Sequence, residues 1–193
     1  ISLLLMGALA AREKQFTLYK SAGCKLGKRT IRPHMLALQK LGIAVESTEE
    51  TYEVDATKLT GGIIIMDESG DTATENAILG AVLASGETTI KFASANYMVQ
   101  DLCHFLVDAG AKIEGIGTTT LKITGVEQLN DITYAAMPDP VDAMAWISLA
   151  VTTKSPLVIE RCPLDFLELE MEKMRLMGQQ FTLTNERMST NGY

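Results

Sequence analysis

Three related hexamers recur along the chain: Leu41-Gly42-Ile43-Ala44-Val45-Glu46, Ala109-Gly110-Ala111-Lys112-Ile113-Glu114 and Met177-Gly178-Gln179-Gln180-Phe181-Thr182. Their glycines are separated by 68 residues both times. Each hexamer follows an amphipathic helical run, at residues 35–40, 99–108 and 164–176. Glycine fits the position just after a helix, because it adopts a positive φ at little steric cost. The hexamers therefore predict a repeated structural unit.

A second type of helix also recurs, built from small residues, at 2–11, 74–85 and 142–152. Each precedes a β-like run, at 16–20, 88–92 and 156–160. The predicted unit is helix, strand, helix, strand, strand, about 68 residues long. Such alternation predicts an α/β or α+β fold with helices packed on sheets, in which helix 74–85 is buried on most sides. Met137-Pro138-Asp139-Pro140 is the predicted domain boundary, because two prolines interrupt regular structure.

The composition favours a globular protein of one or two domains. The chain has 193 residues, of which 47% are hydrophobic and 21% charged, with a formal net charge of −7. This acidic balance argues against a nucleic-acid-binding surface. Three cysteines form no disulfide framework and favour a reducing cytoplasm. The apolar run Ile1–Ala11 is shorter than the roughly 20 residues that span a membrane, and no basic segment precedes it, so we expect neither a membrane span nor a signal peptide there. Because the chain begins without Met, we expect a fragment of a longer protein.

Five of the seventeen Lys and Arg residues fall between Lys20 and Arg32, around Cys24. A positive field favours the thiolate, and glycines on both sides of the cysteine let the backbone bend. Arg29 can hold a carboxylate or phosphate with two parallel hydrogen bonds. Cys24 is therefore a candidate nucleophile or general acid beside a small anion. A surface loop with an ordinary cysteine and solvated lysines is the equally weighted alternative.

Other polar residues leave two interpretations open. His34 is expected either to approach a ligand or to cap the helix that starts near Ile31. The loop 66–76 supplies Ser, Gly, Asp and Thr before a helix, so a helix cap is favoured over a ligand-binding loop. Cys103 is expected in the core, and Cys103-His104 has no second pair at metal-ligand spacing. We therefore expect neither a metal nor another cofactor.

Several motifs together resemble the UDP-N-acetylglucosamine 1-carboxyvinyltransferases of the enolpyruvyl transferase family. They run through nearly the whole chain. The most specific are Gly23-Cys24-x-x-Gly27-x-Arg29, Ala73-Thr74-Glu75-Asn76, Phe105-Leu-x-x-x-Gly110-Ala-Lys-Ile and Pro138-Asp139. The resemblance implies an inside-out α/β barrel made of repeated units. It assigns residues 1–137 to part of the cysteine-loop domain and residues 138–193 to one repeat unit of the second domain.

The resemblance also implies an enzyme. Its reaction moves the enolpyruvyl group of phosphoenolpyruvate to the 3-hydroxyl of UDP-N-acetylglucosamine, an early step of peptidoglycan synthesis in the cytoplasm. Cys24 matches the mobile-loop cysteine, which is the proton donor and the target of fosfomycin. Arg29 matches a substrate-binding arginine. Further substrate contacts fall on two stretches: Thr30, Ile31, Arg32, Pro33 and His34, and Glu68, Ser69, Gly70 and Asp71. The missing part of the protein is an implied partner.

Some positions depart from the family pattern. Arg32 stands where an acidic residue is usual, which reverses the charge beside the expected uridine site. Ala95-Asn96-Tyr97-Met98 replaces a charged Arg-Glu-Pro-Glu motif, and Pro140 replaces an arginine. These changes motivate an alternative, a degenerate paralogue that binds a nucleotide sugar or a protein without catalysis. A related transferase acting on 3-phosphoshikimate is a third reading, which the cysteine loop disfavours.

Overall fold

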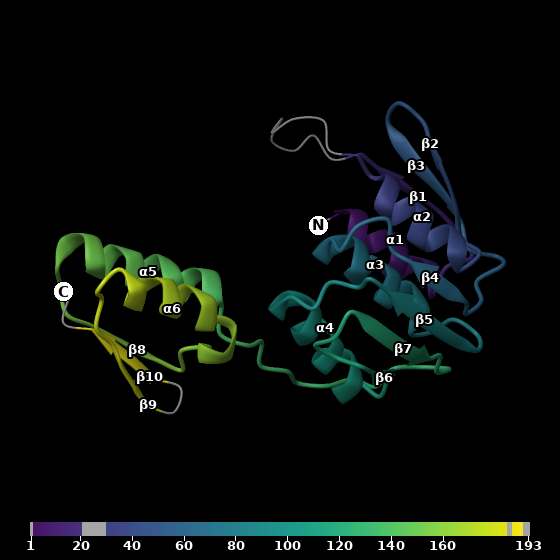
Figure 1. Ribbon diagram of the computed structural model, residues 1–193. Coiled ribbons are helices and arrows are strands. Elements are labelled where there is room, and N and C mark those ends of the chain that lie inside the picture. The colour runs from purple at the N-terminus through teal and green to yellow at the C-terminus, as the bar shows by residue number, and fades with distance from the viewer. Residues whose placement is uncertain (1, 21–29, 185–186, 191–193) are drawn as a thin grey trace. The chain divides into compact units, whose positions relative to one another are not determined.

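The computed structural model describes residues 2–20, 30–184 and 187–190. The chain divides into two compact units, Ile1–Tyr134 and Ala135–Tyr193 (Figure 1). Each unit has its own apolar core. Helices and strands alternate through both units, so the predicted mixed α/β class is confirmed. The division falls just ahead of the stretch that the prolines marked, and Pro140 itself opens a helix.

The first unit begins with a three-stranded antiparallel sheet in the order β1-β3-β2. Its strands are β1 (Gln15–Tyr19), β2 (Ala44–Ser47) and β3 (Thr51–Asp55). The accompanying helices are η1 (Ser2–Leu4), α1 (Leu5–Ala10) and α2 (Arg32–Lys40). One face of the sheet meets the core through Val45 and Val54, which lie opposite each other in the register of β2 and β3.

A four-stranded sheet follows in the same unit, in the order β4-β5-β7-β6. β4 pairs parallel with β5, and the other neighbours are antiparallel. The strands are β4 (Ile63–Ile65), β5 (Glu87–Lys91), β6 (Lys112–Glu114) and β7 (Thr120–Thr124), and the helices are α3 (Asp71–Ala81) and α4 (Tyr97–Asp108). Ile64, Ile90 and Ile123 alternate with exposed or half-buried neighbours and are themselves fully or almost fully buried.

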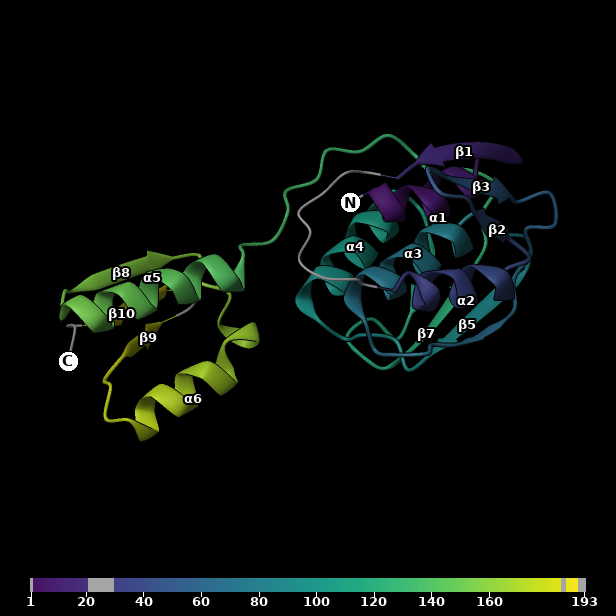
Figure 2. The same ribbon diagram turned by 90° about the horizontal axis from the view of Figure 1, so that it is seen from above.

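Helix α3 lies at the centre of the first unit, beside α1 and α2 (Figures 1 and 2). Eight of its eleven residues are buried, as the small-residue pattern predicts. The approach of α1 is close because Gly7 has no side chain: a Cβ there would lie 2.2 Å from the backbone oxygen of Asn76. Helices α1, α2 and α4 therefore all pack against α3.

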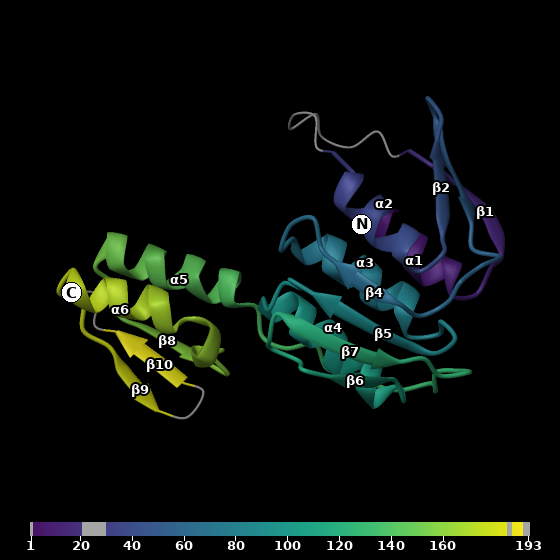
Figure 3. The same cartoon turned by 45° about the vertical axis from the view of Figure 1, so that its right-hand side comes forward.

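The second unit packs two helices on a three-stranded antiparallel sheet of order β8-β10-β9 (Figure 3). Its elements are α5 (Pro140–Thr153), β8 (Leu157–Glu160), η2 (Leu164–Phe166), α6 (Glu168–Leu176), β9 (Thr182–Thr184) and β10 (Arg187–Thr190). Ile147, Met171 and Met188 form the centre of its core. Asp139 caps α5 by accepting a hydrogen bond of 2.8 Å from the backbone N–H of Val141.

Helix α5 differs from α3, although both belong to the recurring small-residue class. Only Pro140, Ala143, Ile147 and Ala150 of its fourteen residues are buried. Apolar side chains stand on its outer face, with Val141 exposed by 64%, and Trp146 and Leu149 by 52% each. The helix has an apolar surface that the described part of its own unit does not cover.

The glycines of the three hexamers take the backbone conformation that the sequence predicts. Their φ angles are 78° at Gly42, 103° at Gly110 and 92° at Gly178. Each follows the end of a helix, α2, α4 and α6 respectively, by two residues. The prediction of left-handed glycines after these helices is confirmed.

Candidate functional site

The predicted site residues fall into three groups. Cys24 and Arg29 lie outside the described residues. The remaining nine lie in the first unit, at the starts of two neighbouring helices: Thr30 to His34 at α2, and Glu68 to Asp71 at α3. The structure therefore brings the two predicted stretches together, although more than thirty residues separate them in sequence.

Opposite charges connect the two helix starts. The Arg32 Nε atom lies 4.0 Å from the Asp67 Oδ2 atom, and both side chains are largely open to solvent. An exposed pair of this kind contributes little stability, about 0–1 kcal/mol. The guanidinium is therefore held loosely beside the α3 loop rather than fixed in place.

The start of α2 owes its geometry to local chemistry. Pro33 occupies the first turn, where a fixed φ suits the helix and the missing N–H has no cost. The hydroxyl oxygen of Thr30 accepts a hydrogen bond of 3.1 Å from the backbone N–H of Arg32. Ile31 is the half-buried residue that precedes the helix. His34 is inside the helix and is not its cap, so that alternative is wrong.

The start of α3 departs from the expected cap. Gly70 precedes the helix, so no side chain caps it, and the side-chain cap predicted from the loop 66–76 is wrong. Thr74 instead donates from its hydroxyl to the carbonyl oxygen of Gly70 at 2.9 Å and accepts from the backbone N–H of Ser94 at 3.0 Å. The hydroxyl of Ser69 donates to the carbonyl oxygen of Ala93 at 3.3 Å. These bonds join the α3 start to the loop that follows β5.

Asp71 is the centre of this junction. One carboxylate oxygen accepts from the Ser94 hydroxyl at 2.5 Å, and the other accepts from the Asn96 side-chain amide at 2.9 Å. Asn96 also caps α4, because its side-chain oxygen accepts from the backbone N–H of Tyr97 at 2.7 Å. The uncharged segment Ala95–Met98 thus contributes one hydrogen bond to the site, from the neutral side chain of Asn96 to the carboxylate of Asp71.

A buried hydrogen bond connects α3 with the first turn of α2. The side chain of Asn76 donates to Nδ1 of His34 over 3.1 Å, and both residues are buried. Burial lowers the pKa of His34 below its ordinary value, while the negative charge of Glu68 acts in the opposite direction. At neutral pH the imidazole is therefore uncharged, although acidic side chains stand near the site.

Glu75 is an ionisable residue of α3 that is almost fully buried, with 9% of its surface exposed. Burial raises its pKa, and the negative charge of Asp71 one turn earlier adds to this effect. On α4, burial raises the pKa of the Cys103 thiol to about 11, with a further contribution from Glu75. Cys103 is a neutral core residue, as predicted.

Sequence reasoning missed Asp67, Ser94 and Asn96 as neighbours of the site, and it saw Asn76 only as part of a motif. One signal was available for Asn76, because a carboxamide in the middle of an apolar helix needs a partner. No comparable signal marks Ser94, which reaches Asp71 across 23 positions of sequence.

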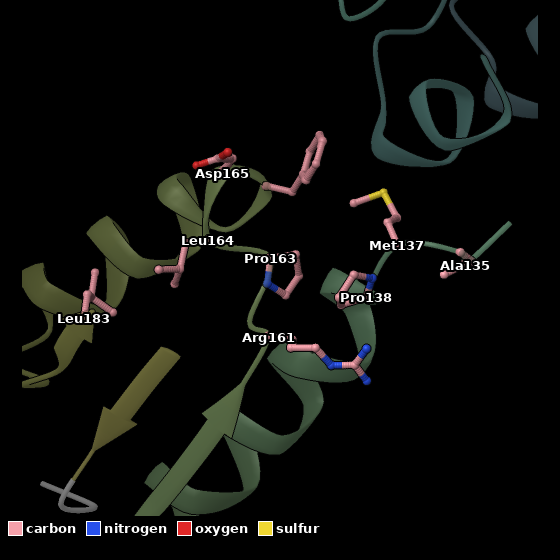
Figure 4. Close-up of a pocket in the computed structure, with 10 residues that line it drawn as sticks. Ala135, Met137, Pro138, Arg161, Pro163, Leu164, Asp165 and Leu183 are labelled. Carbon is pink, nitrogen blue, oxygen red and sulfur yellow. The ribbon is translucent and has the colours of Figure 1, made fainter. Parts of the chain in front are cut away.

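The second unit contains a separate cavity of about 730 Å³ (Figure 4). It lies where the chain enters α5 and where η2 begins, between Met137, Pro138, Arg161, Pro163 and Leu164. Arg161 has a positive φ of 52° and contributes a guanidinium to the lining. No predicted site residue lines this cavity.

The sequence profile described as EPSP synthase (3-phosphoshikimate 1-carboxyvinyltransferase) matches residues 2–192. The chain belongs to this family of enolpyruvyl transferases. A relative in Bradyrhizobium diazoefficiens named UDP-N-acetylglucosamine 1-carboxyvinyltransferase is 43% identical over 86% of the chain. A relative of the same name in Hydrogenovibrio crunogenus is 35% identical over 97% of it.

The solved structure of the enolpyruvyl transferase NikO from Streptomyces tendae shares the fold. It superposes with a TM-score of 0.81 at 22% identity and covers 97% of this chain and 46% of its own. The chain spans 38% of the Bradyrhizobium relative and 45% of the Hydrogenovibrio relative. Among the described residues of this enolpyruvyl transferase chain, no helix is long and apolar enough to cross a bilayer.

Proposed function

We propose that the protein carrying this chain is an enolpyruvyl transferase that uses phosphoenolpyruvate and UDP-N-acetylglucosamine in peptidoglycan precursor synthesis. The observation that carries the proposal is the meeting of the two predicted binding stretches at the starts of α2 and α3 in a member of this family. Relatives named for the UDP-sugar, rather than for 3-phosphoshikimate, support the acceptor.

In this proposal Cys24 is the proton donor and Arg29 holds an anionic substrate. The acceptor oxygen bonds to C2 of phosphoenolpyruvate while C3 takes a proton. C3 then returns a proton to the thiolate of Cys24, and the bond between C2 and the phosphate oxygen breaks. The acceptor's hydroxyl proton leaves with the phosphate group, so the atoms balance. A proton donor beside C3 lowers the barrier of the first step.

The nucleotide sugar is placed against Thr30 to His34 and Glu68 to Asp71. Two backbone features support an anion there. The first N–H groups of α3 have no partners within that helix, and the dipoles of both helices favour negative charge at their starts. Arg32 adds a cation that is only loosely paired with Asp67. Asp71 is already engaged by Ser94 and Asn96, which limits its repulsion of a phosphate.

We further propose the inside-out barrel architecture, with residues 1–137 in the cysteine-loop domain and residues 138–193 as a unit of a second domain. The strand orders β1-β3-β2, β8-β10-β9 and, within the four-stranded sheet, β5-β7-β6 support it. In each of these, the third strand along the chain lies between the first and the second. Two buried free thiols, Cys103 and Cys162, support a reducing compartment such as the cytoplasm.

The partner in this proposal is the remaining part of the enolpyruvyl transferase, which covers the apolar face of α5. Val141, Trp146 and Leu149 support this, because exposed apolar side chains in a row mark an interface. We expect the chain to co-purify with the unmatched portion of the Bradyrhizobium relative. Trp146→Glu should abolish that association, and Lys154→Glu, at the polar end of α5, should not.

Fosfomycin alkylation tests the proposal on the chain itself. We expect one adduct at Cys24 by mass spectrometry, faster when UDP-N-acetylglucosamine is present, and none in Cys24→Ser. Cys103 and Cys162 serve as internal controls because both are buried. Alkylation of Cys24 at the same rate with and without the sugar would contradict the proposed site. Sugar binding without phosphate release from the completed protein would instead support the degenerate paralogue.

A further inference from the structure

Asn76 is fully buried in α3 and uses both ends of its side-chain amide. Its Oδ1 atom accepts a hydrogen bond of 2.7 Å from the backbone N–H of Gly7. Its Nδ2 atom lies 2.9 Å from the carbonyl oxygen of Leu3 and 3.1 Å from Nδ1 of His34. The Asn76 side chain thus links α3 to η1, α1 and α2 through hydrogen bonds.

These partners fix which end of the amide is which. A backbone N–H can only donate, so the atom facing Gly7 must be the oxygen. A backbone carbonyl can only accept, so the atom facing Leu3 must be the nitrogen. A flipped amide would place two donors together at Gly7 and two acceptors together at Leu3. The orientation therefore follows from main-chain groups whose roles do not change.

The fixed amide in turn fixes the imidazole. The second hydrogen of Asn76 Nδ2 points at Nδ1 of His34, so Nδ1 must be an acceptor without a proton. A neutral ring carries its proton on one nitrogen, which leaves it on Nε2. Protonating Nδ1 would set two donors against each other inside the core, which costs the full desolvation of an unpaired group.

The Nε2–H group is not sealed in. Among the described residues, Thr88 has the only buried side-chain oxygen or nitrogen that lacks a hydrogen-bond partner. The described residues offer no partner to Nε2 of His34, so this atom must keep access to the surface. His34 as a whole residue is 7% exposed. His34 belongs to the first turn of α2, beside the start of α3.

We propose that Asn76 is a positioning residue that locks His34 as a neutral Nε2–H donor, and that this N–H binds an acceptor oxygen of the nucleotide sugar. The second half rests on the proposed function. The lock also restricts the chemistry, because a neutral imidazole with a fixed Nδ1 acceptor neither takes nor delivers the proton of the transfer. His34 then serves substrate binding, and proton delivery remains with Cys24.

Nitrogen NMR of the ¹⁵N-labelled chain tests the lock directly. The chain has two histidines, so His104→Gln assigns the remaining ring signals to His34. We expect the Nε2–H tautomer at pH 7.5. The Nδ1–H tautomer or an imidazolium at that pH would overturn the lock. This measurement needs neither a ligand nor a variant in the core.

Asn76→Asp tests whether Asn76 is the cause. A carboxylate accepts from Gly7 but cannot donate to Nδ1, so we expect a proton to move onto Nδ1 of His34. Asn76→Ala removes the donor without adding charge, and we expect a mixture of tautomers. An unchanged Nε2–H pattern in whichever variant folds would overturn the role of Asn76.

Calorimetry with UDP-N-acetylglucosamine tests the ligand contact. We expect His34→Phe to weaken binding about tenfold, because one hydrogen bond is lost. His34→Gln places an amide N–H near the position of Nε2 and should stay within about threefold of the native chain. Equal binding by His34→Phe would overturn the contact. If the chain completed by the remaining part of the transferase does not bind the sugar, both the contact and the proposed acceptor are overturned, while the NMR result still decides the lock.

Discussion

The hydroxyl of Ser94 donates a hydrogen bond of 2.5 Å to the carboxylate of Asp71 and thereby ties the loop before α4 to the first turn of α3. The same hydroxyl oxygen accepts from the backbone N–H of Asn96 at 3.2 Å. Ser94 is 6% exposed, so its loss leaves these groups partly desolvated. The bond is therefore a structural support for the candidate site as well as a contact within it.

We expect Ser94→Ala to lower the free energy of unfolding of the first unit by about 1–3 kcal/mol, since an ionised acceptor loses its donor. Urea denaturation followed by circular dichroism measures the change. Thr72→Ala is the matched control, because Thr72 lies in the same turn of α3 and is exposed. Equal stabilities of the two variants would show that the bond contributes nothing.

The Asn76–His34 contact predicts a pH dependence of stability. Burial lowers the pKa of His34 in the folded state below the ordinary value of 6.5. The unfolded chain therefore binds the proton more tightly, so the contribution is complete above about pH 6.5 and is lost as the pH falls. We expect the native chain to lose stability relative to His34→Gln between pH 7.5 and 5, at most about 1.4 kcal/mol per pH unit. Urea titrations at several pH values measure the difference, and parallel curves would contradict it.

Local signals predicted the framework because they act over a few residues. A glycine two positions after each of α2, α4 and α6 marks a turn that only a positive φ allows, and the three glycines adopt it. The small residues of α3 predicted a helix packed on most sides, because no large polar face would be available for solvent. The predicted helices and strands therefore lie within a few residues of those observed.

The candidate site was less visible because its contacts are long-range. The Asn76–His34 contact spans 42 positions and the Asp71–Ser94 bond spans 23, and neither has a periodic signature. The same tertiary contacts defeated the local cap rule at α3, where Thr74 bonds Gly70 and Ser94 instead of capping the helix. Helix α5 belongs to the same small-residue class as α3, yet it has an exposed apolar face. Composition alone does not predict whether other elements of the same unit cover such a face.

Glu75 predicts a substitution that stabilises the protein. Its pKa is raised by burial and by Asp71, so ionisation at neutral pH opposes folding. Because the folded pKa exceeds the ordinary value of 4.5, the neutral acid stabilises below that pH and the benefit is lost as the pH rises. We expect Glu75→Gln to be more stable than the native chain at pH 8, with a difference that shrinks towards pH 4. Chemical denaturation at both pH values measures this. Glu68→Gln, an exposed change on the same segment, should give no such trend.

The left-handed glycines predict a graded pair of effects. An alanine at Gly178, where φ is 92°, meets no atom within 4 Å, so it costs only the backbone strain of about 1–2 kcal/mol. An alanine at Gly42, where φ is 78°, places its Cβ 2.2 Å from the backbone oxygen of Lys58. Since a main-chain carbonyl cannot rotate away as a side chain can, the segment after β3 must move.

We therefore expect Gly42→Ala to destabilise the first unit by clearly more than Gly178→Ala destabilises the second. Hydrogen exchange measured by mass spectrometry separates the two, because it reports opening in each unit independently. Faster exchange in α2 and β3 should mark Gly42→Ala, and faster exchange in α6 should mark Gly178→Ala. Equal losses of protection would mean that the left-handed backbone, and not the contact with Lys58, sets the requirement for glycine at both positions.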